Sequence, residues 1–104
     1  MINEILTATG RPYRETQFPA EPPAGTYAVY MDDVTADGPD NENRIFFHDV
    51  TVEWYEPKPD PKTEAAFEAE LNRRGIKWTK QARYWIKEVK RYQVIYEFSY
   101  IIKT

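Results

Sequence analysis

The sequence predicts a small α+β domain in which one main helix packs across one face of a sheet of about four strands. Two segments alternate apolar and polar residues as half-buried strands do, residues 44–55 and residues 92–103. A third segment between them, residues 61–74, carries the signals of a capped amphipathic helix. We therefore expect an antiparallel or mixed sheet with the element order ββαββ, preceded by a short N-terminal helix.

The two alternating segments each present a continuous apolar face to the predicted core. These faces are Phe46, His48, Val50, Val52 and Trp54 in the first segment, and Tyr92, Val94, Tyr96, Phe98, Tyr100 and Ile102 in the second. Residues 26–34 are rich in β-forming residues and predict an earlier strand. Residues 35–43 are dense in turn-forming residues, so we expect them to form the loop of a hairpin.

The main helix has clear start and stop signals. Asp60 is a good N-cap, and the proline that follows it suits the first helical position. Gly75 supplies the left-handed residue that ends many helices, which predicts a helix over residues 61–74. Phe67 and Leu71 are one turn apart, so we expect both to face the sheet.

The N-terminal quarter predicts a short helix followed by an arm. Residues 2–9 place three apolar side chains on one side of a helix that Gly10 would end. Residues 11–25 contain four prolines, which lack amide donors, and therefore predict an extended and largely unpaired arm. Tyr13 and Phe18 are its expected anchors.

The C-terminal segment predicts a second hairpin. Residues 76–89 are expected to begin and continue one strand, and Lys90-Arg91 is the expected turn into the strand at 92–103. With 104 residues, the chain has the size of one domain. We expect residues 1–25 to form the helix and arm, and residues 26–104 to form the core.

The composition excludes several classes of protein. The chain has no cysteine, which rules out disulfides and thiolate metal sites and favours a reducing compartment. Its N-terminus lacks the basic and apolar regions of a signal peptide. No apolar run approaches the roughly 20 residues that a membrane-spanning helix needs.

The charges are distributed unevenly along the chain. Residues 1–60 contain twelve acidic and four basic residues, whereas residues 61–104 contain five acidic and ten basic residues. This asymmetry fits either an unevenly charged solvated surface or complementary surfaces that meet between subunits. The candidate interface residues are the acids Asp32, Asp33, Asp37, Asp40 and Glu42, and the bases Arg73, Arg74, Lys80 and Arg83.

Residues for catalysis are scarce, and we expect no enzyme and no cofactor. Ser99 is the only serine and His48 the only histidine, and neither lies in a catalytic motif. Asp33 begins a pattern like that of a calcium-binding loop, but Arg44 occupies the position that requires a glutamate ligand. The sequence therefore predicts no metal site.

Two alternative functions remain open at this point. Bases and aromatic residues interleave over residues 77–92, a composition typical of surfaces that bind single-stranded nucleic acid. Asp40, Glu56 and Lys58 imitate the acidic and Glu-x-Lys pattern of metal-dependent nucleases, although Pro57 separates two of these residues.

Two stretches carry a family resemblance. The first begins with Arg11-Pro-Tyr-Arg-Glu-Thr-Gln-Phe and continues through the strand at 26–33, and the second covers residues 78–101. Both resemble small minor tail or head–tail joining proteins of long-tailed bacteriophages and prophages, the tail terminator or tail completion group. The resemblance extends from about residue 10 to the C-terminus.

This resemblance implies a non-enzymatic structural protein of the virion with an α+β fold. It implies assembly as a homo-oligomeric ring, often a hexamer, in contact with tail-tube and head-connector proteins, and at most a passing contact with DNA. The protein would reside in the virion, and in the host cytoplasm during assembly. The family supplies no catalytic residue, so the interface residues named above rest on charge and expected exposure alone.

Overall fold

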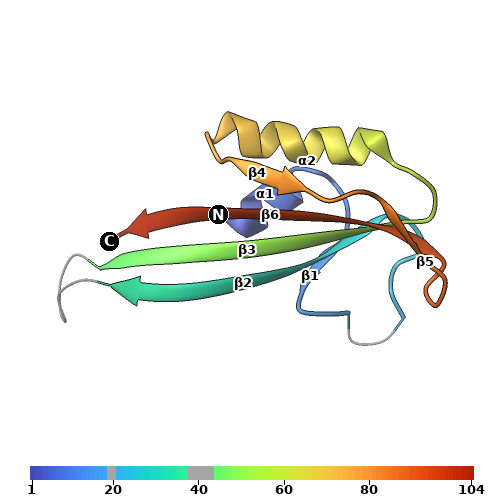
Figure 1. Cartoon of the computed structure of the whole chain (residues 1–104), viewed down its shortest axis with the longest axis horizontal. Helices are drawn as coiled ribbons and strands as arrows, with labels where there is room; N and C mark the ends of the chain where they lie inside the picture. Colours follow the sequence, from blue (N-terminus) through green and yellow to red (C-terminus); the bar gives the residue numbers. More distant parts are fainter. Residues whose placement is uncertain (19–20, 38–43) are drawn as a thin grey trace.

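The computed structural model describes residues 1–18, 21–37 and 44–104 (Figure 1). Over these ranges the chain forms two helices and six strands. In chain order they are α1 (Ile2–Thr7), β1 (Tyr13–Glu15), β2 (Tyr27–Asp37), β3 (Ile45–Glu56), α2 (Pro61–Arg73), β4 (Trp78–Lys80), β5 (Tyr84–Ile86) and β6 (Arg91–Lys103).

The described strands form one mixed sheet in the order β1-β2-β3-β6-β4, with β5 beside β4 on the same edge of β6. Strand β1 runs parallel to β2, and all other pairs are antiparallel. The α+β class is confirmed. The expected number of about four strands and the simple ββαββ order are wrong in detail, because β1 adds a strand and the segment before β6 is divided into β4 and β5.

The core lies between the sheet and the two helices, which both pack on the same face (Figure 1). Trp54, Phe67 and Tyr96 form its centre, with Phe67 of α2 set edge-on against both rings. The predicted inward faces of β3 and β6 are confirmed, since Val50, Val52, Val94 and Phe98 are also buried there. Helix α1 closes one end of the core with Ile2, Ile5 and Leu6.

Helix α2 begins and ends close to the predicted positions. The Asp60 carboxylate accepts a hydrogen bond from the backbone N–H of Thr63 at 3.1 Å, as an N-cap does. Gly75 has a φ of +71°, so the left-handed residue predicted after the helix is present. Neither described helix is long and apolar enough to span a membrane.

The proline-rich arm differs from the prediction, because it is partly paired. Residues Tyr13–Glu15 lie between two prolines and keep their amides, and they form the edge strand β1 beside β2. Phe18 then packs edge-on against Tyr27 at 5.2 Å between ring centroids. Further on, the guanidinium of Arg91 donates to the carbonyl oxygen of Ala24 at 2.8 Å. The described part of the arm therefore docks on the sheet of its own chain.

The predicted loop over residues 35–43 begins later than expected. Thr35, Ala36 and Asp37 continue β2 and pair with Phe47, Phe46 and Ile45. The remainder of that loop, residues 38–43, lies outside the described residues. As a result, β2, β3 and β6 extend together beyond the helices at one end of a molecule 47 Å long (Figure 1).

Candidate functional site

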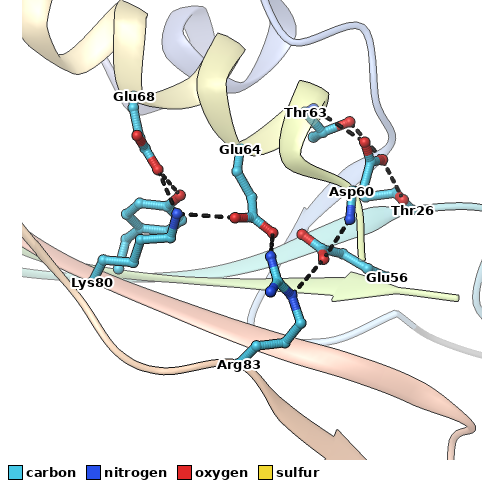
Figure 2. Close-up of polar contacts among 9 residues, drawn as sticks. Thr26, Glu56, Asp60, Thr63, Glu64, Glu68, Lys80 and Arg83 are labelled. Atoms are coloured by element: carbon cyan, nitrogen blue, oxygen red, sulfur yellow. Dashed lines mark hydrogen bonds and ion pairs between the residues drawn. The ribbon is translucent and has the colours of Figure 1, made fainter. Parts of the chain in front are cut away.

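A cluster of charged side chains lies between α2 and the edge of the sheet formed by β4 and β5 (Figure 2). Arg83 donates to Glu64 at 2.6 Å, and its Nε lies 3.5 Å from a carboxylate oxygen of Glu56. The Nζ of Lys80 lies 2.9 Å from Glu64 and 2.7 Å from Glu68. Two of the predicted interface cations are therefore already paired with carboxylates of the same chain.

A one-residue bulge places both cations on the helix side of the sheet. Lys80 pairs with Tyr96 and Tyr84 pairs with Gln93, so three residues of the edge lie opposite two residues of β6. In an uninterrupted strand, Lys80 and Arg83 would point to opposite faces, because successive side chains alternate. The extra residue shifts this alternation by one position. Arg83 consequently points toward α2, where it donates a hydrogen bond to Glu64 (Figure 2).

The electrostatics of the cluster centre on Glu56, which is fully buried. One of its oxygens accepts from the backbone N–H of Asp60 at 3.0 Å, and the other has no hydrogen-bond partner. Burial, reinforced by the neighbouring Glu64, raises the pKa of Glu56 to about 7. Burial also opposes ionisation of Glu64, but its interactions with Glu56, Lys80 and Arg83 hold the pKa of Glu64 below its ordinary value. The cluster thus joins α2 to the sheet edge and contains one carboxyl that titrates near neutral pH.

The predicted acidic interface residues have different surroundings. Asp32 points to the helix side, where its carboxylate lies 3.0 Å from the Nδ1 atom of His48, and both side chains are partly buried. Asp33 points to the opposite face of the sheet and is exposed, as is Asp37 at the end of β2. Two further acids lie outside the described residues, Asp40 and Glu42.

The predicted basic residues at the end of α2 share one partner. Arg73 and Arg74 both lie within 3.0 Å of the same carboxylate oxygen of Glu70. Arg73 is well exposed, whereas Arg74 is only partly exposed. The four predicted cations therefore all have intrachain carboxylate partners. The spacing of Glu70 from Arg73 and Arg74 on the predicted helix was a sequence signal for two of these contacts. No local pattern indicated the contacts of Lys80 and Arg83 with α2.

Of the residues considered for catalysis, those that the structure describes do not form a catalytic arrangement. Ser99 donates to Asp49 at 2.6 Å on the face of the sheet away from the helices, whereas His48 lies on the helix side and stacks on Tyr100. Glu56 is buried in the charged cluster, and Lys58 lies in the exposed loop that follows β3. Within the described ranges, no three His, Cys, Asp or Glu side chains are arranged to hold a metal ion.

The basic and aromatic residues of 77–92 are divided between several environments. Trp78 packs on the core edge and donates from its ring nitrogen to Asn72 at 2.9 Å. The guanidinium of Arg91 binds carbonyl oxygens of the arm. The exposed remainder comprises Lys77 before β4, and Tyr84, Trp85, Lys87 and Lys90 in β5 and the turn that leads into β6. The apolar residue Val89 is exposed in the same turn.

Large apolar side chains are exposed at the two ends of the sheet. Phe47 and Ile101 pair across β3 and β6 on the face away from the helices, and they are 37% and 53% exposed. At the opposite end, Tyr84 and Trp85 of β5 are 67% and 45% exposed. These residues were not among the predicted interface positions. The sequence did contain a signal for Phe47 and Ile101. Both are apolar residues on the outward face of the alternating strands, where polar residues are expected.

The geometry thus defines an α+β protein with a mixed sheet, two helices on one face and exposed apolar groups at both ends. No protein-family model and no curated protein matches the sequence. Among solved structures, the fold is similar to that of a chain in the "Virion of native gene transfer agent (GTA) particle". The TM-score is 0.59 at 16% sequence identity, and the match covers 96% of this chain and 84% of that chain.

Proposed function

We propose that this protein is a non-enzymatic structural component of a phage or prophage virion, of the tail terminator or head–tail joining type. The observation that carries the proposal is the similarity of fold to a virion chain over 96% of this chain. The resemblance of residues 11–33 and 78–101 to tail proteins supports the same class.

The proposed mode of action is assembly into a homo-oligomeric ring that contacts tail-tube and connector proteins. A ring requires two different surfaces on each subunit, because each copy must contact one neighbour on either side. The exposed apolar groups at opposite ends of the sheet, described above, meet this requirement. Exposed aromatic and aliphatic side chains of this size are typical of surfaces that become buried on association.

The experiment that tests the proposed function is a measurement of mass in solution. The purified protein would be examined by light scattering and sedimentation, alone and mixed with the tail-tube protein encoded in the same genome. We expect either self-assembly or co-assembly with the tail tube, and negative-stain images should contain closed rings. A protein that stays monomeric under both conditions and does not bind tail tubes would contradict the proposal.

A further inference from the structure

The exposed apolar groups at one end of the sheet have acidic neighbours, and those at the other end have basic neighbours. On the face away from the helices, Phe47 and Ile101 lie beside a cross-strand row that contains Asp33 and Asp49. The row on their other side contains Asp37, Ile45 and Lys103, so three acids and one base surround the two apolar residues on this face. Thr35 of β2 lies in the same cross-strand row as Phe47 and Ile101. We call the set of Asp33, Thr35, Phe47, Asp49 and Ile101 the blade surface, since it lies where β2, β3 and β6 extend beyond the helices (Figure 1).

The other end carries basic residues among its apolar groups. Tyr84, Trp85 and Val89 are exposed around the turn from β5 to β6, and Lys87 and Lys90 are exposed beside them. Residues 87–91 contain three bases and one acid. We call the five exposed residues the turn surface. Ile101 of the blade surface is eight residues along β6 from the partner of Tyr84, about 26 Å away in an extended strand.

We propose that copies of this chain associate head to tail, with the blade surface of one copy against the turn surface of the next. This inference rests on the proposed function and names the surfaces that would meet in the ring. Contact between two blade surfaces would bring acids together, and contact between two turn surfaces would bring lysines together. Only the unlike pair combines apolar burial with complementary charge.

The consequence of this pairing is an open-ended assembly. Each contact leaves a blade surface free on one copy and a turn surface free on the other, so further copies add in the same way. Such a heterologous contact closes into a ring when the rotation per copy permits it. Tyr84 would be the main anchor, since large aromatic residues dominate the energy of many protein interfaces. Trp85, the next residue of β5, points to the opposite face of the sheet, where its ring packs against Tyr92.

The test uses one variant for each surface, chosen at its most exposed apolar position. Ile101→Lys places a positive charge on the blade surface, where it would repel the lysines of the turn surface. Tyr84→Glu places a negative charge on the turn surface, where it would repel the acids of the blade surface. Ala65→Lys and Ala69→Glu make the same changes in charge at exposed positions of α2 and serve as controls.

We expect each surface variant to weaken self-association at least about tenfold, while both controls assemble like the original chain. Mixing Ile101→Lys with Tyr84→Glu should restore association, since one intact surface remains on each variant and the new lysine and glutamate attract each other. Sedimentation velocity of the separate and mixed variants measures these outcomes, and circular dichroism checks that both variants are folded.

Three outcomes would overturn the inference. The first is assembly by both variants at the original strength, which would leave the proposed ring intact but place its contacts elsewhere. The second is a mixture that remains monomeric, or dimers formed by either variant alone. The third is an original chain that stays monomeric but binds single-stranded oligonucleotide in a way that Tyr84→Glu abolishes. That result would assign the turn surface to nucleic acid, and it would contradict the proposed ring as well.

Discussion

Arg83 reaches Glu64 across the boundary between the sheet edge and helix α2, with 2.6 Å between the donating nitrogen and the carboxylate oxygen. Glu64 is almost completely buried, so its charge depends on partners within the chain. The bulge that turns Arg83 inward therefore determines how α2 is fixed to the edge of the sheet. This relationship assigns Arg83 a role in stability, in addition to the interface role predicted from charge.

Removing the charge of Arg83 should destabilise the protein. Arg83→Met leaves the carboxylates of Glu56 and Glu64 buried with fewer partners, and we expect a loss of about 2–3 kcal/mol in the free energy of unfolding. Lys77→Met removes the same charge from an exposed position and should change stability by less than about 0.5 kcal/mol. Urea denaturation of both variants makes the comparison. Equal effects of the two substitutions would show that the charged cluster contributes little to the free energy of unfolding.

Stability should depend on pH through Glu56. Because the folded protein raises the pKa of Glu56 from 4.5 to about 7, it binds a proton more tightly than the unfolded chain between these values. Stability contributed by this proton is complete below about pH 4.5 and is lost as the pH rises through 7. Glu56→Gln keeps an acceptor for the Asp60 amide and removes the titration.

The measurement is the difference in unfolding free energy between the original chain and Glu56→Gln at several pH values. From pH 5 to pH 8, the original chain should lose on the order of 2 kcal/mol relative to the variant. Other titrating groups contribute to both proteins and largely cancel in the difference. A difference that stays constant over this range would contradict the assignment.

Asp60 should contribute more than an ordinary helix cap. It accepts from the Thr63 backbone, and its second oxygen accepts from the hydroxyl groups of Thr26 and Thr63 and lies 3.3 Å from Arg11. Asp60→Ala removes these contacts together, so we expect a loss of about 2 kcal/mol, at the upper end of the range for N-caps. Thermal unfolding of this variant beside Asp60→Asn, which retains cap acceptors, separates the cap from the charge. The asparagine variant should lose clearly less.

The same carboxylate predicts a loss of stability in acid. Burial opposes ionisation of Asp60, but its hydrogen bonds with Thr63 and Thr26 outweigh this effect and lower the pKa of Asp60. Its contribution is therefore present above the ordinary aspartate pKa of 3.8 and disappears as the pH falls through the lower folded value. The Asp60→Asn variant should show a weaker decline in stability below about pH 4. An unchanged acid transition would exclude this role.

Substitution of Asp32 should affect stability, whereas substitution of the neighbouring Asp33 should affect self-association. Asp32→Ala removes the partner of His48 on the helix side, and we expect a loss of about 1 kcal/mol with little change in self-association. Asp33→Ala lies on the blade surface and should weaken self-association while leaving unfolding nearly unchanged. Parallel denaturation and sedimentation of the two variants provide the measurement. The reverse pattern would contradict the placement of the interface on the outer face.

Much of the fold could be predicted because local patterns and tertiary structure agree. Alternation in β3 and β6 identified Trp54, Tyr96 and Phe98 as core residues, and the sequence Asp60-Pro61 marked the start of α2. The site was less predictable. Arg83 and Lys80 are ordinary exposed bases when strand periodicity is considered alone, and their shared partner Glu64 is sixteen or more residues away in sequence.

The sequence by itself determined the start of α2 and its end to within one residue, the inward faces of the long strands and the absence of any thiol chemistry, because each of these depends on neighbouring residues or composition. It placed the end of α1 two residues too late, at residue 9 in place of Thr7. Tertiary structure alone decided that Tyr13–Glu15 pairs with β2, that a bulge turns Arg83 toward Glu64, and that Phe47 and Ile101 stay exposed on the face that the helices do not cover. These features depend on which distant segments meet and on which face of the sheet the helices cover. Local periodicity carries no information about either.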